Sequence, residues 1–446
     1  MEQRKYGLFT VIAMITGVVI GSGIFFKSYN ILISTQGNVL LGVLVFILCA
    51  FGIVFGSLAI AQLARRSDTA GGVITYAEKF CSMPVACCFG WFHSLLYYPT
   101  LIAVVSWVAG IYTCSLFGWE SSLELQVLIG TGYMVLLFGM NTLSARVGGY
   151  FQNASCVIKL IPLLLIAAAG LLWGRPGEVV LQGIQTAGDS KGWIAAVGAV
   201  AFSFDGWIVS TSICHEIKDS RRNLPLALIC APVLILAAYV LYFVGISSLL
   251  GPERIMAIGP DHAYAAAQMI FGATGGRILL VFIIVSVLGT VNGLILGLIR
   301  IPYSLAQRKM FFASGRFGKL TKGFGLSVPS AALSLGVCAV WMVLHYLTQK
   351  FQLLPNSDVS EISIVVNYLA YLFLYAAVVR LARKGEIRSV FAGYAVPALA
   401  ALGSGFILLG GIKNPLFPWY LAVCGLMIGA ALFYYHCNKG RIVPHS

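Results

Sequence analysis

The stretch GVVIGSGIF at residues 17–25 decides the fold of this chain. It places Gly17, Gly21 and Gly23 in the middle of an apolar segment, 7–27, that is long enough to cross a membrane as a helix. Each glycine lowers helix stability, and together they favour local unwinding. Unwound backbone is tolerated inside a bilayer only where it lines a cavity. The stretch therefore predicts a broken helix beside a binding site, with close helix packing of the GxxxG kind as the alternative.

The composition around this stretch is that of an integral membrane protein. Hydrophobic residues make up 59% of the 446 residues and charged residues only 10%, which excludes an ordinary soluble chain. The short alternating segments of a β-barrel are absent. We therefore predict an all-α membrane protein with about twelve transmembrane helices. The expected spans are 7–27, 38–64, 86–113, 122–143, 150–173, 192–216, 226–250, 276–306, 326–347, 360–382, 391–411 and 416–436.

The spans divide into two groups of five, followed by two more. A segment rich in glycine at 174–191 separates the groups. The first span of the second group carries FSFDGW at 202–207, again a glycine beside polar residues. Interrupted helices at matching positions of two halves mark the binding site of an inverted-repeat transporter. We predict one domain over 1–446, with repeats at about 7–173 and 192–382 and accessory helices at about 391–436.

The basic residues indicate how the chain is oriented. The net charge is +14, and most Lys and Arg residues fall in segments that are cytoplasmic if the N-terminus is cytoplasmic. Positively charged loops are held on that side, so we expect both termini inside the cell. Anionic membrane lipid is the expected partner of this charge. Nucleic acid is not, because the chain has no soluble basic domain.

No residue pattern indicates a metal, a cofactor or an enzyme. The chain has eleven cysteines, which fall mostly inside apolar spans as small hydrophobic residues. Cys87 and Cys88 lack the spacing of a zinc site. Only Cys114, predicted near the outer surface, is a candidate for an intermolecular disulfide. His93 has no HExxH motif or acidic partner nearby, so we interpret it as a packed or hydrogen-bonded core residue. A channel filter sequence is also absent.

The two breaks together suit a zwitterionic ligand. Freed amides around Ser22 and Gly23, at the start of a half-helix, offer donors and a positive dipole to a carboxylate. Freed carbonyls can accept hydrogen bonds from an ammonium. We expect these carbonyls around Ile20, Phe202, Ser203 and Asp205. The sequence therefore predicts a site for an α-amino acid.

Two ionisable residues lie inside predicted spans. Asp205 is the only carboxylate deep in a span, so it is expected to contact substrate, carry a proton, or cap the second half-helix through backbone amides. Lys159, in NASCVIKLIPL, is a buried cation that needs oxygen partners. Its candidate partners are carbonyls near Gly17 and Gly21 together with Ser286. Lys159 would then stand where other transporters bind sodium, unless its side chain extends to the cytoplasmic surface.

These motifs resemble those of the amino acid–polyamine–organocation superfamily. The resemblance rests on GSGIF in the first span, KLIP in the fifth, FSFDGW and EIKDSRRNLP around the sixth, and NGLILGLIRIPYSLA in the eighth. Within the superfamily the chain is most similar to the L-type amino acid transporter branch and its bacterial relatives. The likeness covers essentially the whole chain. It implies a five-plus-five inverted-repeat fold with discontinuous first and sixth helices and two additional C-terminal helices.

The resemblance also implies roles for matching residues. Ser22, Gly23 and Ile24 match the turn that binds the substrate carboxylate, and Phe202 matches the aromatic gate over the substrate. Ser203 and Asp205 match the stretch that faces the amine and the substrate side chain. Lys159 matches the lysine that replaces the sodium ion of coupled relatives.

We therefore expect a secondary transporter of neutral or small polar L-amino acids, working by sodium-independent exchange through alternating access. The alternative is proton-coupled uptake of amino acids or of an amine such as a polyamine, with Asp205 as proton carrier. Animal relatives pair with a glycoprotein heavy chain, but nothing in this sequence requires one. The expected location is a bacterial inner membrane.

Overall fold

The computed structural model describes residues 7–67, 72–186, 192–208, 217–321, 326–354 and 357–443, and every regular element in these ranges is a helix. Ten of the described helices are long and apolar enough to cross a membrane, or eleven if the bent pair at the N-terminus forms one span. The predicted sixth span, 192–216, is described only to residue 208. The prediction of an all-α membrane protein is confirmed, whereas the division into two repeats stays a prediction.

The helices fall on either side of residue 192. Those before it are α1 (Leu8–Val19), α2 (Ser22–Ser34), α3 (Val39–Ala64), α4 (Gly72–Phe80), α5 (Met83–Phe92), η1 (His93–Tyr97), α6 (Tyr98–Phe117), α7 (Leu123–Leu143), α8 (Ala145–Ile158), α9 (Leu160–Trp173) and α10 (Pro176–Gln185). Those after it are η2 (Trp193–Ala195), α11 (Ala196–Phe204), α12 (Ser220–Leu250), α13 (Pro252–Ile258), η4 (Gly259–Asp261), α14 (His262–Leu298), α15 (Arg300–Gln307), α16 (Ser314–Phe317), α17 (Val328–Lys350), α18 (Val359–Arg383), η5 (Phe391–Ala395), α19 (Val396–Ile412), α20 (Phe417–Asn438) and η6 (Lys439–Arg441).

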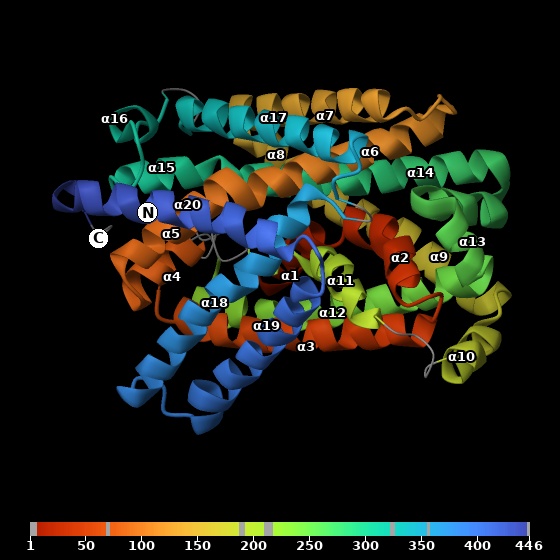
Figure 1. The fold of residues 1–446 in the computed structure, drawn as a ribbon, viewed down its shortest axis with the longest axis horizontal. Coiled ribbons are helices and arrows are strands. Elements are labelled where there is room, and N and C mark those ends of the chain that lie inside the picture. Colours follow the sequence, from red (N-terminus) through yellow and green to blue (C-terminus); the bar gives the residue numbers. More distant parts are fainter. Residues whose placement is uncertain are drawn as a thin grey trace.

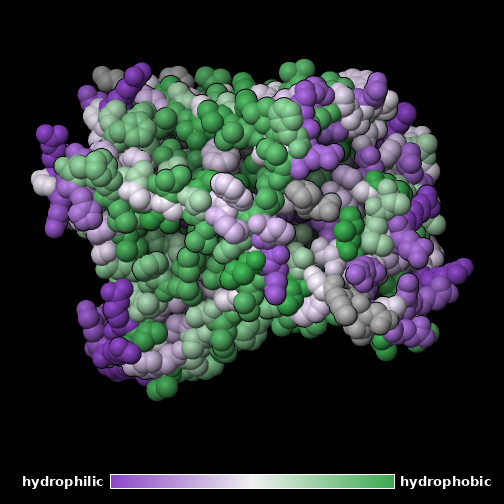
Figure 2. Space-filling view, viewed as in Figure 1, coloured by the Kyte–Doolittle hydropathy of each residue, from purple (hydrophilic) through white to green (hydrophobic). Residues whose placement is uncertain are grey.

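The long helices run side by side, and the two broken ones lie among them (Figure 1). Figure 2 shows hydrophobic side chains gathered over the middle of the molecule and hydrophilic ones at its two ends. Many leucine and phenylalanine side chains of the long helices are exposed, such as Leu426 of α20 at 77% exposure. Because hydrocarbon solvates such side chains, the hydrophobic middle is the part of the surface that faces lipid.

The first span is broken as predicted. α1 and the helix that follows it meet at an angle of 48°. Between them Ile20 has an extended backbone, and Gly21 has φ −168° and ψ −130°. A Cβ atom at Gly21 would lie 2.0 Å from the Thr290 hydroxyl, and one at Gly23 would lie 2.5 Å from the Cα atom of Ser203. The glycines therefore both break the helix and allow close packing of helices. The broken helix and the close packing, given as alternatives from the sequence, are both present.

The second break follows α11. This helix ends at Phe204, Asp205 is extended, and Gly206 has a φ of +95°, a value that favours glycine. α11 packs against α2 and α3. The continuation of the predicted sixth span, 209–216, lies outside the described residues.

The prediction that the first span ends near Lys27 was wrong. α2 continues to Ser34, and Lys27 is buried inside the protein. Its charge is matched by two acidic residues at the start of α18, Asp358 and Glu361. A charge next to an apolar run looks like the end of a span, but burial is tolerated when the partners are present.

Candidate functional site

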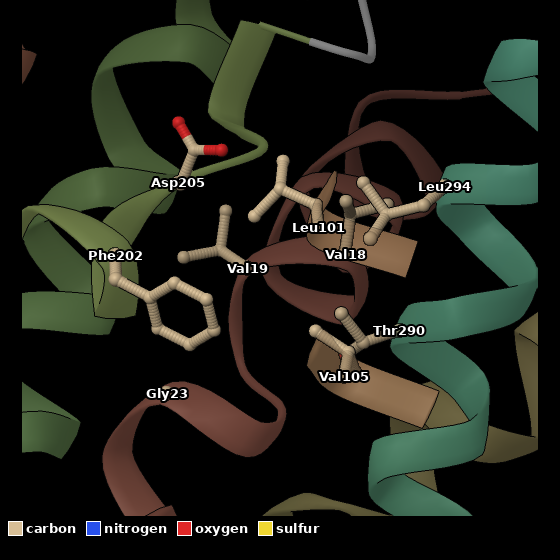
Figure 3. A pocket seen from close by; sticks show the side chains of 9 residues that line it. All are labelled: Val18, Val19, Gly23, Leu101, Val105, Phe202, Asp205, Thr290 and Leu294. Atoms are coloured by element: carbon tan, nitrogen blue, oxygen red, sulfur yellow. The ribbon is translucent and has the colours of Figure 1, made fainter. Parts of the chain in front are cut away.

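A small cavity lies between the two breaks (Figure 3). Helices α1, α2, α6, α11 and α14 contribute to its wall, together with the extended residue after α11. Its volume is about 20 Å³, which is room for about one water molecule. The cavity must therefore widen to accept an amino acid. Its lining residues are Val18, Val19, Gly23, Leu101, Val105, Phe202, Asp205, Thr290 and Leu294.

Of the predicted site residues, Gly23, Phe202 and Asp205 line this cavity. Three further predicted residues are close in sequence to the lining residues but are not part of the lining. Ile20, Ser203 and Ile24 belong to the two breaks and to the start of α2, and Ile24 is fully buried. For Ser22 the structure describes the backbone, as the first residue of α2, but not the side chain.

The start of α2 lies at the cavity, which Gly23 lines. The first amides of any helix lack partners within the helix, and the helix dipole adds partial positive charge there. In this protein those amides belong to Ser22, Gly23 and Ile24. Because a side chain at Gly23 would collide with the backbone of Ser203, this position admits only glycine without a shift of α11. The geometry suits an anionic group.

Backbone carbonyls at the two breaks accept hydrogen bonds from side chains of neighbouring helices. The Ile20 carbonyl accepts a hydrogen bond from the Thr290 hydroxyl at 3.4 Å. The carbonyls of Val19 and Ser203 both accept from the hydroxyl of Tyr239, at 3.1 and 2.8 Å. Tyr239 belongs to α12, and no sequence motif singles it out. The carbonyls of Val19 and Ser203 therefore lie close to one another, and carbonyl oxygens are acceptors that an ammonium can use.

Phe202 lies against the cavity and next to a buried ion-pair cluster. The ammonium of Lys27 is 5.0 Å from the centre of the Phe202 ring. It also lies 2.6 Å from a carboxylate oxygen of Asp358 and 3.1 Å from one of Glu361. One ammonium thus links α2, the Phe202 ring and the start of α18. We call Lys27, Asp358 and Glu361 the outer cluster.

Asp205 lines the cavity, and hydrogen bonds hold its carboxylate in place. The hydroxyl of Tyr97, at the end of η1, donates to this carboxylate at 2.5 Å, and the Gly206 amide also hydrogen-bonds to it. The carboxylate therefore both lines the cavity and caps the backbone that follows it. The Tyr97 ring stacks on His93, with ring centres 4.8 Å apart. His93 in turn lies 3.1 Å from Asn367, which confirms the prediction that it is a packed, hydrogen-bonded core residue.

Lys159 lies between α8 and α9, which together form one span, and is fully buried. Its ammonium donates to the carbonyl of Gly17 and, at 3.4 Å, to the hydroxyl of Thr290. The side chain does not extend to the surface. Ser286 is not a partner: its hydroxyl is buried and has no hydrogen bond within the described part of the chain. Thr290, one helical turn further along α14, makes the contact with Lys159 that was expected of Ser286.

Metal ligands are not grouped in the described ranges: no three or more His, Cys, Asp or Glu side chains come close enough together to hold an ion. The polar groups at the cavity are backbone amides, backbone carbonyls, one carboxylate and hydroxyls. Such groups bind charged organic ligands through hydrogen bonds.

Comparison with known proteins finds relatives over most of the chain. Residues 6–438 match the family model described as amino acid permease. The serine/threonine exchanger SteT of Bacillus subtilis is 28% identical over 411 residues, covering 91% of this chain and 90% of SteT. The b(0,+)-type amino acid transporter 1 of Mus musculus is 25% identical, covering 97% and 87%. The large neutral amino acids transporter small subunit 2 of Homo sapiens is 26% identical, covering 83% and 68%.

Replacing Lys159 with alanine should slow transport more than it weakens substrate binding. The change leaves the Gly17 carbonyl without its donor, so the first break loses the contact that ties it to α8 and α9. We expect solute flux into proteoliposomes to fall about tenfold, with a smaller change in the half-saturating concentration. Ser286→Ala is the matched control and should transport normally, because its hydroxyl makes no hydrogen bond in the described ranges. Unaltered flux in Lys159→Ala would exclude the role of its ammonium.

Proposed function

Since the chain belongs to the amino acid permease family, we propose that it exchanges neutral or small polar L-amino acids across the membrane without sodium. Its relatives are transporters and not enzymes. The observation that carries the proposal is the pair of helix breaks on opposite sides of one cavity. One break presents amides, and the other helps to present carbonyls. An α-amino acid has a carboxylate and an ammonium to match them.

In the proposed complex the substrate carboxylate binds the amides of Ser22, Gly23 and Ile24. The ammonium binds carbonyls at the ends of α1 and α11, around Ile20, Phe202, Ser203 and Asp205. The substrate side chain then faces Asp205 and the apolar residues of α6. Leu101 and Val105 would contact its apolar part, and the carboxylate of Asp205 would accept from a hydroxyl or amide. This combination favours small polar and neutral side chains.

Phe202 would serve as the gate, held by the outer cluster. Opening on that side requires α2 and α18 to separate, since Lys27 bonds to acidic residues of α18 and its N-cap. With these contacts made, the Phe202 ring stays over the cavity. Breaking them would expose the site, which gives alternating access with a small movement of helices.

Lys159 would replace a bound sodium ion. Its ammonium holds a carbonyl of α1 and a hydroxyl of α14 together, which is the task of a cation between these helices. A permanently attached cation would allow exchange without a sodium gradient. Gly17 supplies the carbonyl, and Thr290 takes the part that was expected of Ser286.

We place the protein in the bacterial inner membrane with both termini in the cytoplasm. Exposed basic residues gather in and beside α4, α15 and α16, as in Lys79, Lys309 and Arg316, which fits the cytoplasmic side and contact with anionic lipid. We also propose that it works without a heavy chain. Cys114, the candidate for an intermolecular disulfide, is buried inside the protein.

Proton-coupled uptake of an amino acid or amine is the second candidate function. The observation that favours it is the Asp205 carboxylate, which lines the cavity and bonds to the Tyr97 hydroxyl. A carboxylate in this position can accept a proton as well as a ligand.

Exchange predicts that uptake depends on internal substrate. Purified protein in proteoliposomes should take up radiolabelled L-serine at least about tenfold faster when unlabelled L-serine is inside, because the loaded site then returns with a substrate bound. Collapsing the pH gradient should leave this rate unchanged. Protein-free liposomes are the control. Uptake that ignores internal amino acid but disappears with the pH gradient would instead support the proton-coupled alternative.

The outer cluster predicts that replacing Lys27, its one cation, strongly lowers the rate of exchange. Lys27→Met keeps a long, unbranched side chain but leaves two buried carboxylates without their partner, a change that costs about 3–5 kcal/mol in other proteins. We expect exchange to fall about tenfold or more, and the triple variant that adds Asp358→Asn and Glu361→Gln to regain part of the rate.

The matched control for Lys27→Met is Lys350→Met. Lys350 pairs with Glu124 at 3.3 Å, but both side chains are exposed, at 48% and 60%. Surface pairs of this kind contribute little, so this variant should exchange normally. Normal exchange in Lys27→Met, or an equal loss in Lys350→Met, would argue against a gate held by the outer cluster.

A further inference from the structure

The outer cluster sets one positive charge against two negative ones. The ammonium of Lys27 pairs with Asp358 at 2.6 Å and with Glu361 at 3.1 Å, and within the described part of the chain neither carboxylate has a second ion-pair partner. The three side chains are only 2%, 3% and 11% exposed. With all three ionised, one negative charge would be in excess, and an uncompensated buried charge is costly. Either a further cation lies nearby or one carboxylate carries a proton.

The surroundings of the cluster offer no second cation. The titratable groups that face it from other helices are Tyr29 of α2, His345 of α17 and Tyr420 of α20, and tyrosine hydroxyls are neutral near pH 7. α11 faces Glu361 with Gly198, where a Cβ atom would lie 3.5 Å from the carboxylate. The helices α3, α6 and α19, which also pack against α18, contain no charged residue.

His345 does not supply the missing positive charge. Its side chain is fully buried, and neither ring nitrogen has a hydrogen-bond partner among the described residues. Its ring instead packs edge-on against that of Trp107, with the ring centres 4.6 Å apart. Because a charged imidazole needs acceptors for both of its N–H groups, a ring in this environment is neutral. The excess negative charge is therefore balanced by a proton on a carboxylate.

Glu361 is the carboxylate that suits the proton. Asp358 accepts from three donors, namely the ammonium of Lys27, the hydroxyl of Ser360, and the amide of Ser360 at 2.9 Å. Such donors stabilise the ionised form. Glu361 has the longer contact with Lys27, and its other oxygen lies 2.6 Å from the hydroxyl of Ser357. Since a hydroxyl can accept as well as donate, this bond persists when Glu361 is protonated.

Polar side chains connect Glu361 to the surface. The hydroxyl of Ser357 lies 3.1 Å from that of Tyr420, which lies 3.5 Å from the side-chain amide of Asn414. Ser357 and Asn414 are half-buried, and they belong to the connections α17–α18 and α19–α20. Both connections are extracellular if the N-terminus is cytoplasmic. Because the hydroxyls both donate and accept, they offer a route for a proton from the outside.

We propose that Glu361 binds one proton from the outside and that this proton keeps the outer gate closed. With the proton the cluster is neutral and can stay buried. Without it, the excess charge favours the open form, in which water reaches the carboxylate. The effect on exchange rests on the proposed function, whereas the proton site does not. Because the proton binds and leaves on the same side, it is not transported, and a pH gradient does not drive exchange.

Infrared difference spectroscopy of the purified protein tests the proton site without transport. A protonated carboxyl group has a carbonyl band that a carboxylate lacks. We expect the wild type to gain such a band on acidification from about pH 8 to about pH 5.5, and Glu361→Gln to lack most of it. Glu124→Gln is the matched control and should keep the band, because Glu124 is 60% exposed and pairs with Lys350 at the surface. A band that Glu361→Gln retains in full would overturn the proposal.

The control of the gate is measured as the KM for external L-serine in proteoliposomes, with the external pH varied and the internal pH fixed. Since the proton favours the closed form and external substrate needs the open one, the two oppose each other. We expect the wild-type KM to fall about tenfold as the external pH rises from about 5.5 to about 8. Glu361→Gln, which is always neutral, should keep the acidic wild-type KM at every external pH, and Glu124→Gln should follow the wild type.

Two results would overturn the control of the gate. One is a wild-type KM that does not change with external pH, a measurement that needs no variant to fold. The other is a pH-dependent KM that persists in Glu361→Gln. If the wild type carries no amino acid at all, the proposed function fails, and the infrared band alone then supports or overturns the proton site. Wild-type exchange without the band overturns the inference and leaves the proposed function standing.

Discussion

Backbone hydrogen bonding inside the membrane is the constraint on which this structure depends. A helix satisfies its own amides and carbonyls, so a helix that stops in mid-membrane leaves polar groups that hydrocarbon cannot solvate. The chain stops two helices in this way, at Ile20–Gly21 and at Asp205–Gly206. Such breaks are tolerated only when other groups supply the missing partners, and the partners that this protein provides also shape the cavity.

Each break is held by side chains from helices that are themselves continuous or only bent. Lys159, Thr290 and Tyr239 donate to carbonyls of the first break. Tyr239 also reaches the second break, where Tyr97 donates to Asp205. The donors thus fix the carbonyl side of the cavity, while the start of α2 faces it with amides. A ligand with both charges completes the hydrogen bonding that the protein supplies in part, which gives a physical reason for an amino acid to bind at this point.

The sequence predicted what is local and missed what depends on distant partners. Glycine clustering located the first break, and the polar residues beside Gly206 located the second, because both signals lie within a few residues. Lys27 was misread as the end of a span, since its acidic partners lie more than three hundred residues later in the chain. Thr290 was missed in favour of Ser286, one turn away on the same helix, because the rotation of α14 is set by packing. Tyr239 gives no local signal, since one tyrosine in an apolar span is ordinary.

The central claim is that the two breaks hold the carboxylate and the ammonium of one substrate. The most direct test is competition for binding of a radiolabelled L-amino acid to the purified protein, using two analogues with the same side chain. One analogue replaces the ammonium by a hydroxyl, and the other replaces the carboxylate by a neutral amide. The account predicts that each analogue competes at least about tenfold more weakly than the amino acid itself, because charge-assisted hydrogen bonds are lost in both. An analogue that competes as well as the amino acid would contradict it.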